Sequence, residues 1–105
     1  MLTKWPLWTI TEEDFMKFTR FNNPFHPGEI LLEDFIIPMG FSQRHFAAQI
    51  GWTPRKLNEI VKGKRGLTAA TAIDLSEFLK TTPEFWMNLQ RTWDLFLEYK
   101  ARQAS

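Results

Sequence analysis

The sequence predicts a compact all-α domain of five to six helices. Apolar residues recur at spacings of three and four, Ser and Thr stand where helix N-caps are expected, and Gly or Pro stands where helices end. No segment alternates apolar and polar residues as a half-buried strand would. With 105 residues, the chain has the length of one domain with a single hydrophobic core.

Residues 1–25 form an aromatic-rich N-terminal extension. Thr11 and the three acidic residues after it predict a short helix at about residues 12–19, with Thr11 as its N-cap. The aromatic side chains of this extension either fold back onto the domain or offer a surface to a partner. They are Trp5, Trp8, Phe15, Phe18, Phe21 and Phe25.

The domain is expected at residues 26–101. Pro27 favours an extended His26 and suits the first turn of a helix, so we expect a helix from here to Ile37. Pro38 and Gly40 then end it.

Four more helix starts and stops follow. Ser42 and Gly51 bound the second helix of this domain, and Thr53 and Gly63 bound the third. A fourth helix is expected at about residues 68–79, beginning at Thr68. The Thr-Pro-Glu sequence at 82–84 begins the last and longest helix, which we expect to end at about residue 101, before a tail at 102–105.

The segment Ser42–Gly66 has the pattern of a helix-turn-helix. Ala47 provides the small residue needed where two helices cross closely, and Gly51 tolerates the positive φ of the turn. Leu57 and Ile60 anchor the second helix and leave its other face free. The combination favours a DNA-binding unit over a plain helical hairpin.

Charge is concentrated on this segment. Six cations and one anion, Glu59, give it a net charge of +5, whereas the other residues hold seven cations and eleven anions. A basic segment on an otherwise acidic chain is typical of phosphate binding.

The outward face of the second helix is expected to enter the major groove of DNA. Arg55 can hydrogen-bond guanine and Asn58 can hydrogen-bond adenine, while the start of the first helix and the loop after the second suit phosphate. The predicted DNA-binding residues are Gln43, Arg44, Thr53, Arg55, Lys56, Asn58, Lys62, Lys64 and Arg65.

From His26 to about Leu95 the chain resembles the HigA-type antitoxins, or VapI group, of the phage-repressor-like helix-turn-helix superfamily. The resemblance rests on HPGEILLEDF at 26–35, SQ at 42–43 with Ala47 and Gly51, GKRGLT at 63–68, and TPEFWMNLQ at 82–90 followed by WDL. It implies a homodimeric antitoxin that neutralises a small RNA-cleaving, HigB-type toxin, binds double-stranded operator DNA and represses its own operon.

Two residues depart from the family pattern. Trp52 stands where relatives usually have a small aliphatic residue, so we expect the packing between the helices to adapt. Pro54 occupies an early recognition-helix position where a polar residue is common, and it can offer DNA only an apolar contact.

The last helix carries more large apolar residues than one small core needs, which suggests a two-fold contact between subunits. The predicted dimer-interface residues are Trp86, Trp93 and Leu97.

Other classes of function have less support. A stand-alone repressor without a toxin, and an interaction module that has lost DNA binding, remain alternatives. The chain has no Cys and only two His, and neither His has partners at metal-ligand spacing. We therefore expect no catalytic residues, no metal and no cofactor, and so no enzyme. No transmembrane segment or signal peptide is evident, so we expect a cytoplasmic protein without a membrane partner.

Overall fold

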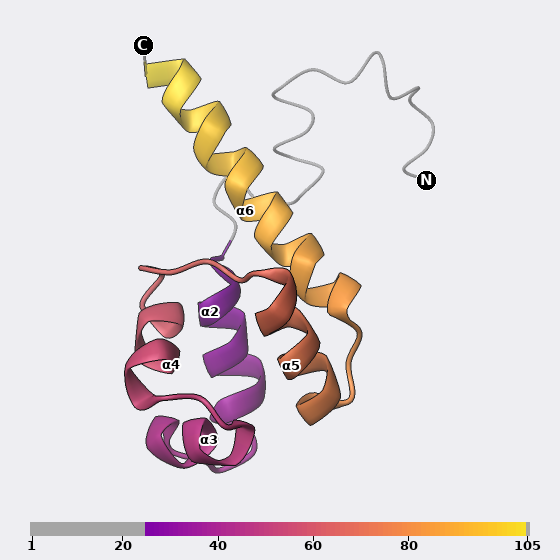
Figure 1. The fold of residues 1–105 in the computed structure, drawn as a ribbon. Helices are drawn as coiled ribbons and strands as arrows, with labels where there is room; N and C mark the ends of the chain where they lie inside the picture. Colours follow the sequence, from indigo (N-terminus) through magenta and orange to yellow (C-terminus); the bar gives the residue numbers. More distant parts are fainter. Residues whose placement is uncertain (1–24, 105) are drawn as a thin grey trace.

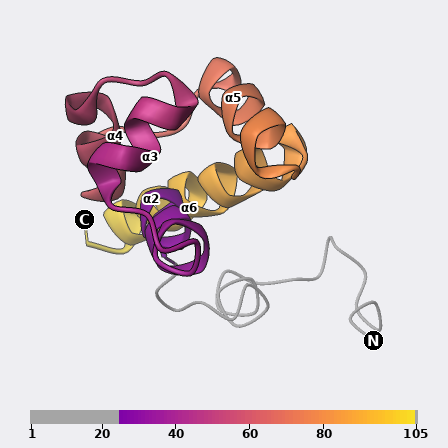
Figure 2. The ribbon, with the colours of Figure 1, turned by 90° about the horizontal axis from the view of Figure 1, so that it is seen from below.

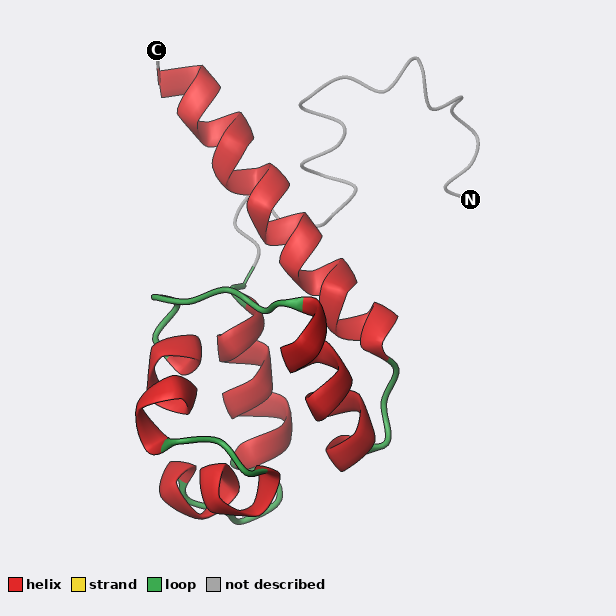
Figure 3. Ribbon diagram, viewed as in Figure 1, coloured by secondary structure: helices red, strands yellow, loops and turns green. Residues whose placement is uncertain are grey.

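The computed structural model describes residues 25–104 of the chain, and helices are the only regular elements in that range (Figures 1 and 3). The helix expected at about residues 12–19 lies outside the described residues. The helices are α2 (Pro27–Ile30), the π-helical η3 (Leu31–Ile36), α3 (Gln43–Ile50), α4 (Pro54–Val61), α5 (Ala69–Leu79) and α6 (Pro83–Ala104). The all-α prediction is confirmed.

The first of these helices changes its winding part way along. His26 caps α2, and the chain continues into η3, where the amide of Ile37 donates to the carbonyl of Leu32, five residues back. A π-helix has more residues per turn than an α-helix. Leu31 and Ile36, five residues apart, are both fully buried, as the wider turn allows. The sequence pattern predicted the helix but not its π-helical part.

Local capping explains the start of each later helix. The hydroxyls of Ser42, Thr53, Thr68 and Thr82 each accept a hydrogen bond from the amide three residues ahead, at 3.0–3.3 Å. Each cap satisfies a helix N–H that has no intrahelical partner. These four predicted starts are confirmed.

The core lies where α2, η3, α3, α4, α5 and the first half of α6 meet. Its fully buried residues include Leu31, Phe46, Leu57, Leu75 and Trp86. Seen from below, α3 and α4 lie on one side of the body and α5 on the other (Figure 2). The second half of α6 projects beyond the other helices (Figure 1).

The last helix is longer than expected. It continues to Ala104, through residues assigned to a tail in the sequence analysis, and the side chains of Glu98 and Arg102 pair at 2.8 Å on it. Residues 102–104 contain no Gly or Pro to stop a helix, and Arg102 suits the negative end of the helix dipole.

Three buried residues join α2, the end of α4 and α6. Gly28 lies so close to α4 that a Cβ built on it would come within 1.8 Å of the Ile60 carbonyl oxygen. The His26 ring lies against Gly63, and its centroid is 5.4 Å from that of Trp93 on α6. The side-chain oxygen of Gln90 on α6 accepts the Leu67 amide at 2.7 Å. We call this contact region, made by His26, Gly28 and Gln90 around residues 60–67, the α2–α4–α6 junction.

The close approach at Gly28 predicts a large effect of Gly28→Ala. The added methyl group meets backbone atoms of Ile60 and Val61, which cannot rotate away, so α2 and α4 must separate. We expect a loss of about 3 kcal/mol in the free energy of unfolding, the upper end for overpacking. Gly40→Ala is the control, because it meets no atom within 4 Å and strains only a positive φ of 75°, for about 1 kcal/mol. Urea unfolding measures both, and equal losses would contradict the close approach.

His26 predicts a pH dependence of stability. Burial lowers its pKa, and the nearby Asp94 carboxylate opposes this effect only partly. Its Nδ1 accepts the Gly28 amide at 2.9 Å, so the second proton has no free nitrogen in the folded state. As the pH falls below about 6.5, the unfolded chain therefore binds this proton before the folded chain does, and the free energy of unfolding decreases.

His26→Asn should remove this part of the pH dependence. An Asn side chain can still cap α2 but does not titrate. Thermal unfolding between about pH 7.5 and 5.5 should therefore show a smaller loss of Tm for the variant than for the native chain. The same loss in both proteins would rule out His26 as its source.

Candidate nucleic-acid interface

Helices α3 and α4 form the predicted helix-turn-helix. Gly51 has a φ of 87° and ends α3, and the amides of Gly51 and Trp52 both donate to the Ala47 carbonyl, at 3.0 and 2.9 Å. Ala47 is fully buried where the two helices pack. The glycine turn and the small residue have the structural roles that the sequence pattern predicts.

Helix α4 is divided into a buried face and an exposed face. Leu57 and Ile60 are fully buried, whereas Arg55, Asn58 and Lys62 are exposed. The exposed side chains follow one another at spacings of three and four, so they share one face of the helix. This face offers the hydrogen-bond donors of Arg, Asn and Lys to a ligand outside the protein.

Two predicted contact residues are partly engaged within the protein. The Thr53 hydroxyl accepts the Lys56 amide at 3.1 Å, which leaves its proton as the group it can donate outward. The Lys56 ammonium lies 4.6 Å from the centroid of the Trp52 ring, and Lys56 as a whole is half-buried. Lys56 therefore projects less freely than Arg55.

The contacts of Trp52 show how the fold accommodates a large ring where relatives usually have a small aliphatic residue. It is buried, with 8% of its surface exposed, and its indole Nε1 donates to Asp74 on α5 at 3.0 Å. The large ring thus ties the turn of the motif to α5, and its polar group has a partner.

Glu59 is a residue of the interface that the sequence analysis did not select. Its carboxylate accepts from Arg55 Nε at 3.1 Å and from Arg65 Nη2 at 2.6 Å. The hydrogen bonds from Arg65 and Arg55 lower the pKa of Glu59, so the carboxylate is ionised at neutral pH. The available signal was its place as the sole anion of Ser42–Gly66, four residues after Arg55.

The basic loop after α4 is held at both ends. The amides of Lys64 and Arg65 donate to the Glu59 carbonyl at 2.9 and 3.2 Å, and the Leu67 amide donates to Gln90. The side chains of Lys64 and Arg65 remain exposed. The loop therefore presents its two cations beside the exposed face of α4 from a fixed backbone.

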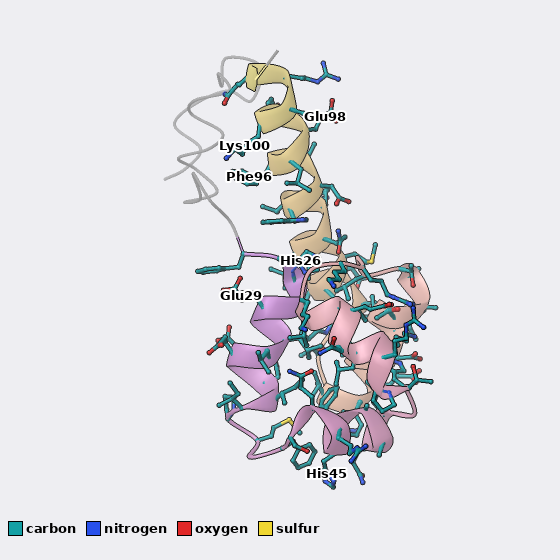
Figure 4. The ribbon with its side chains drawn as sticks, turned by 90° about the vertical axis from the view of Figure 1, so that its left-hand side faces the viewer. His26, Glu29, His45, Phe96, Glu98 and Lys100 are labelled. Carbon is teal, nitrogen blue, oxygen red and sulfur yellow. The ribbon has the colours of Figure 1, made fainter. Side chains whose placement is uncertain are left out.

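The start of α3 lies at the end of the domain opposite the α2–α4–α6 junction. Gln43 is half-buried and Arg44 is exposed, and His45 follows them at this free end (Figure 4). The His45 ring packs against Phe41 at 4.4 Å between centroids.

The residues expected at a dimer interface separate into two groups. Trp86 is fully buried in the core, where its ring packs against Phe35 and its Nε1 donates to Thr81 at 2.7 Å. The expectation that Trp86 meets a second subunit is therefore wrong, because α6 turns this side chain toward α5 and η3. Trp93 is half-buried, whereas 47% of Leu97 is exposed on the projecting half of α6.

Neither histidine belongs to a metal-binding cluster of three or more His, Asp or Glu side chains within the described residues. Glu29 is exposed in the first turn of α2, where a carboxylate suits the positive end of the helix dipole. No helix in residues 25–104 has both the length and the apolar character needed to cross a membrane.

Comparisons with known proteins agree with this geometry. A model of the helix-turn-helix family matches residues 32–86. The chain is 38% identical over 79 residues to virulence-associated protein I of Dichelobacter nodosus, covering 75% of this chain and 73% of that protein. It is 37% identical over 73 residues to antitoxin HigA-1 of Vibrio cholerae serotype O1, covering 70% of this chain and 69% of that protein.

A solved structure gives the same fold. Pseudomonas aeruginosa antitoxin HigA, solved with the higBA promoter, matches with a TM-score of 0.74 and 35% identity, over 78% of this chain and 89% of that chain. The fold, the helix-turn-helix and the relatives agree, and this chain therefore belongs to the HigA-type antitoxins of the helix-turn-helix family.

Proposed function

We propose that this chain is an antitoxin that binds its own operator DNA, represses its operon and neutralises a HigB-type, RNA-cleaving toxin. The observation that carries the proposal is the exposed cationic face of α4 and its loop, on a fold shared with a HigA solved with its promoter. Because binding alone accomplishes both tasks, the chain needs no catalytic residues. Operator and toxin would both be met in the cytoplasm.

The proposed DNA contacts fall into two classes. The exposed Arg55 and Asn58 on α4 have the donors that recognise guanine and adenine in the major groove, with Lys62 one turn later. The exposed Arg44, Lys64 and Arg65 suit phosphates, as do the half-buried Gln43 at the start of α3 and Lys56 in the first turn of α4. Thr53 can still donate its hydroxyl proton to a phosphate.

We further propose a homodimer. An operator with two related half-sites is matched by a protein with two-fold symmetry. Of the residues expected at the interface, Leu97 is exposed and Trp93 is half-buried, and both lie on α6 beyond the core.

Operator binding and toxin neutralisation can each be tested with the native protein. The first experiment uses fluorescence anisotropy to measure binding of the protein to DNA from upstream of its own gene. We expect sequence-specific binding whose affinity falls steeply as salt rises, because about four to six phosphate contacts per subunit release counterions. Binding no tighter than to unrelated DNA would remove the repressor function.

The second experiment expresses the adjacent reading frame with and without this protein. We expect growth arrest from the neighbour alone and growth when both are present. Promoter binding together with a harmless neighbour would identify a stand-alone repressor. Rescue without promoter binding would identify an interaction module.

A further inference from the structure

Within the protein, the Arg55 guanidinium is hydrogen-bonded only through its Nε atom among the contacts of the described residues. Its Nε donates to Glu59 Oε2 at 3.1 Å, one helical turn along α4, while 87% of the Arg55 side chain stays exposed. Among the described residues, no protein acceptor meets its two terminal nitrogens. The carboxylate thus restrains the guanidinium at Nε and leaves its Nη1–Nη2 end free of contacts with acceptors of the other described residues.

This free end has the geometry that guanine requires. The O6 and N7 atoms of guanine are two acceptors on one edge of the base, and two parallel N–H donors of an arginine satisfy both. An arginine whose Nε is already bound has fewer rotamers to lose when it makes such a contact.

The second oxygen of Glu59 is used as well. Oε1 accepts from Arg65 Nη2 at 2.6 Å and from Arg65 Nε at 3.1 Å. One carboxylate therefore lies between two cations, so it does not face DNA phosphates as an uncompensated charge. Only 26% of the Glu59 side chain is exposed, compared with 48% for Arg65.

We propose that Glu59 is the positioning residue for guanine recognition, because it holds Arg55 with its terminal nitrogens outward on α4. The inference rests on the proposed operator binding. It adds that specificity at one base pair depends on an anion that does not itself touch the base.

A purely structural role for Glu59 predicts a different outcome. If Glu59 only stabilised α4 or the loop, its loss would weaken binding to every DNA sequence. If it positions Arg55, its loss weakens the preference for guanine, while removal of a negative charge strengthens binding to unrelated DNA. The preference for guanine then falls while the affinity for unrelated DNA rises.

The test compares Glu59→Gln with the native chain. The native chain and Arg55→Ala are first compared for binding to the upstream DNA and to single-base variants of it. This comparison identifies the position at which Arg55→Ala loses the preference for guanine. At that position, Glu59→Gln should lower the preference by about fivefold or more, the lower end of an arginine–guanine contact. Its affinity for an unrelated duplex should rise. Circular dichroism confirms that the variant is folded.

Two further variants serve as controls. Glu98→Gln breaks an ion pair of the same type, Arg102 Nε to Glu98 Oε2 at 2.8 Å, on the projecting half of α6 (Figure 4), and should leave DNA binding unchanged. Arg65→Ala should weaken binding to all sequences about equally, because it removes a phosphate contact.

The outcomes separate the inference from the proposed function. If the native chain prefers its upstream DNA and Glu59→Gln keeps the full guanine preference, the inference fails and the repressor function stands. If Arg65→Ala loses the guanine preference as Glu59→Gln does, Glu59 acts through Arg65 and the loop instead of through Arg55, and the inference fails. If the native chain shows no sequence preference, both fail.

Discussion

The contact on which the rest of the structure depends is the approach of Gly28 to the last turn of α4. There is no room for a side chain between α2 and the Ile60 carbonyl, so α4 can pack at this distance only against a glycine. His26 and Gln90 complete the α2–α4–α6 junction from either side, through Gly63 and the Leu67 amide. The last turn of α4 is therefore held against α2 by buried backbone contacts. The exposed face of α4 is left free to meet a ligand.

The junction also explains why three separated sequence motifs occur together. HPGE supplies His26 and Gly28, GKRGLT supplies Gly63 and Leu67, and the segment from residue 82 onward supplies Gln90 and Trp93. These residues are far apart in the chain but adjacent in the fold. Lys64 and Arg65 lie within the middle motif, so the packing that closes the core also sets the backbone of the basic loop after α4.

Local interactions were predictable from the sequence. The caps at Ser42, Thr53, Thr68 and Thr82 and the turn at Gly51 depend on residues within a few positions, so their patterns identify them. Trp86 and Glu59 were not predictable in this way. The burial of Trp86 depends on how α6 rotates against η3 and α5, and the role of Glu59 depends on the side-chain positions of Arg55 and Arg65. The π-helical winding of η3, which lets Leu31 and Ile36 both be buried, was likewise not predictable from the local pattern.

The most direct test of this account measures operator affinity in Gln90→Ala. Gln90 is buried on α6, away from the exposed face of α4, and bonds both the Leu67 amide and Asp94. If the α2–α4–α6 junction positions the basic loop, the folded variant should lose up to about fivefold in affinity, because DNA binding must then order a loop that a buried hydrogen bond worth about 1 kcal/mol held before. Asn88→Ala, which changes an exposed residue of the same helix, should bind as the native chain does. Native affinity in folded Gln90→Ala would contradict the account.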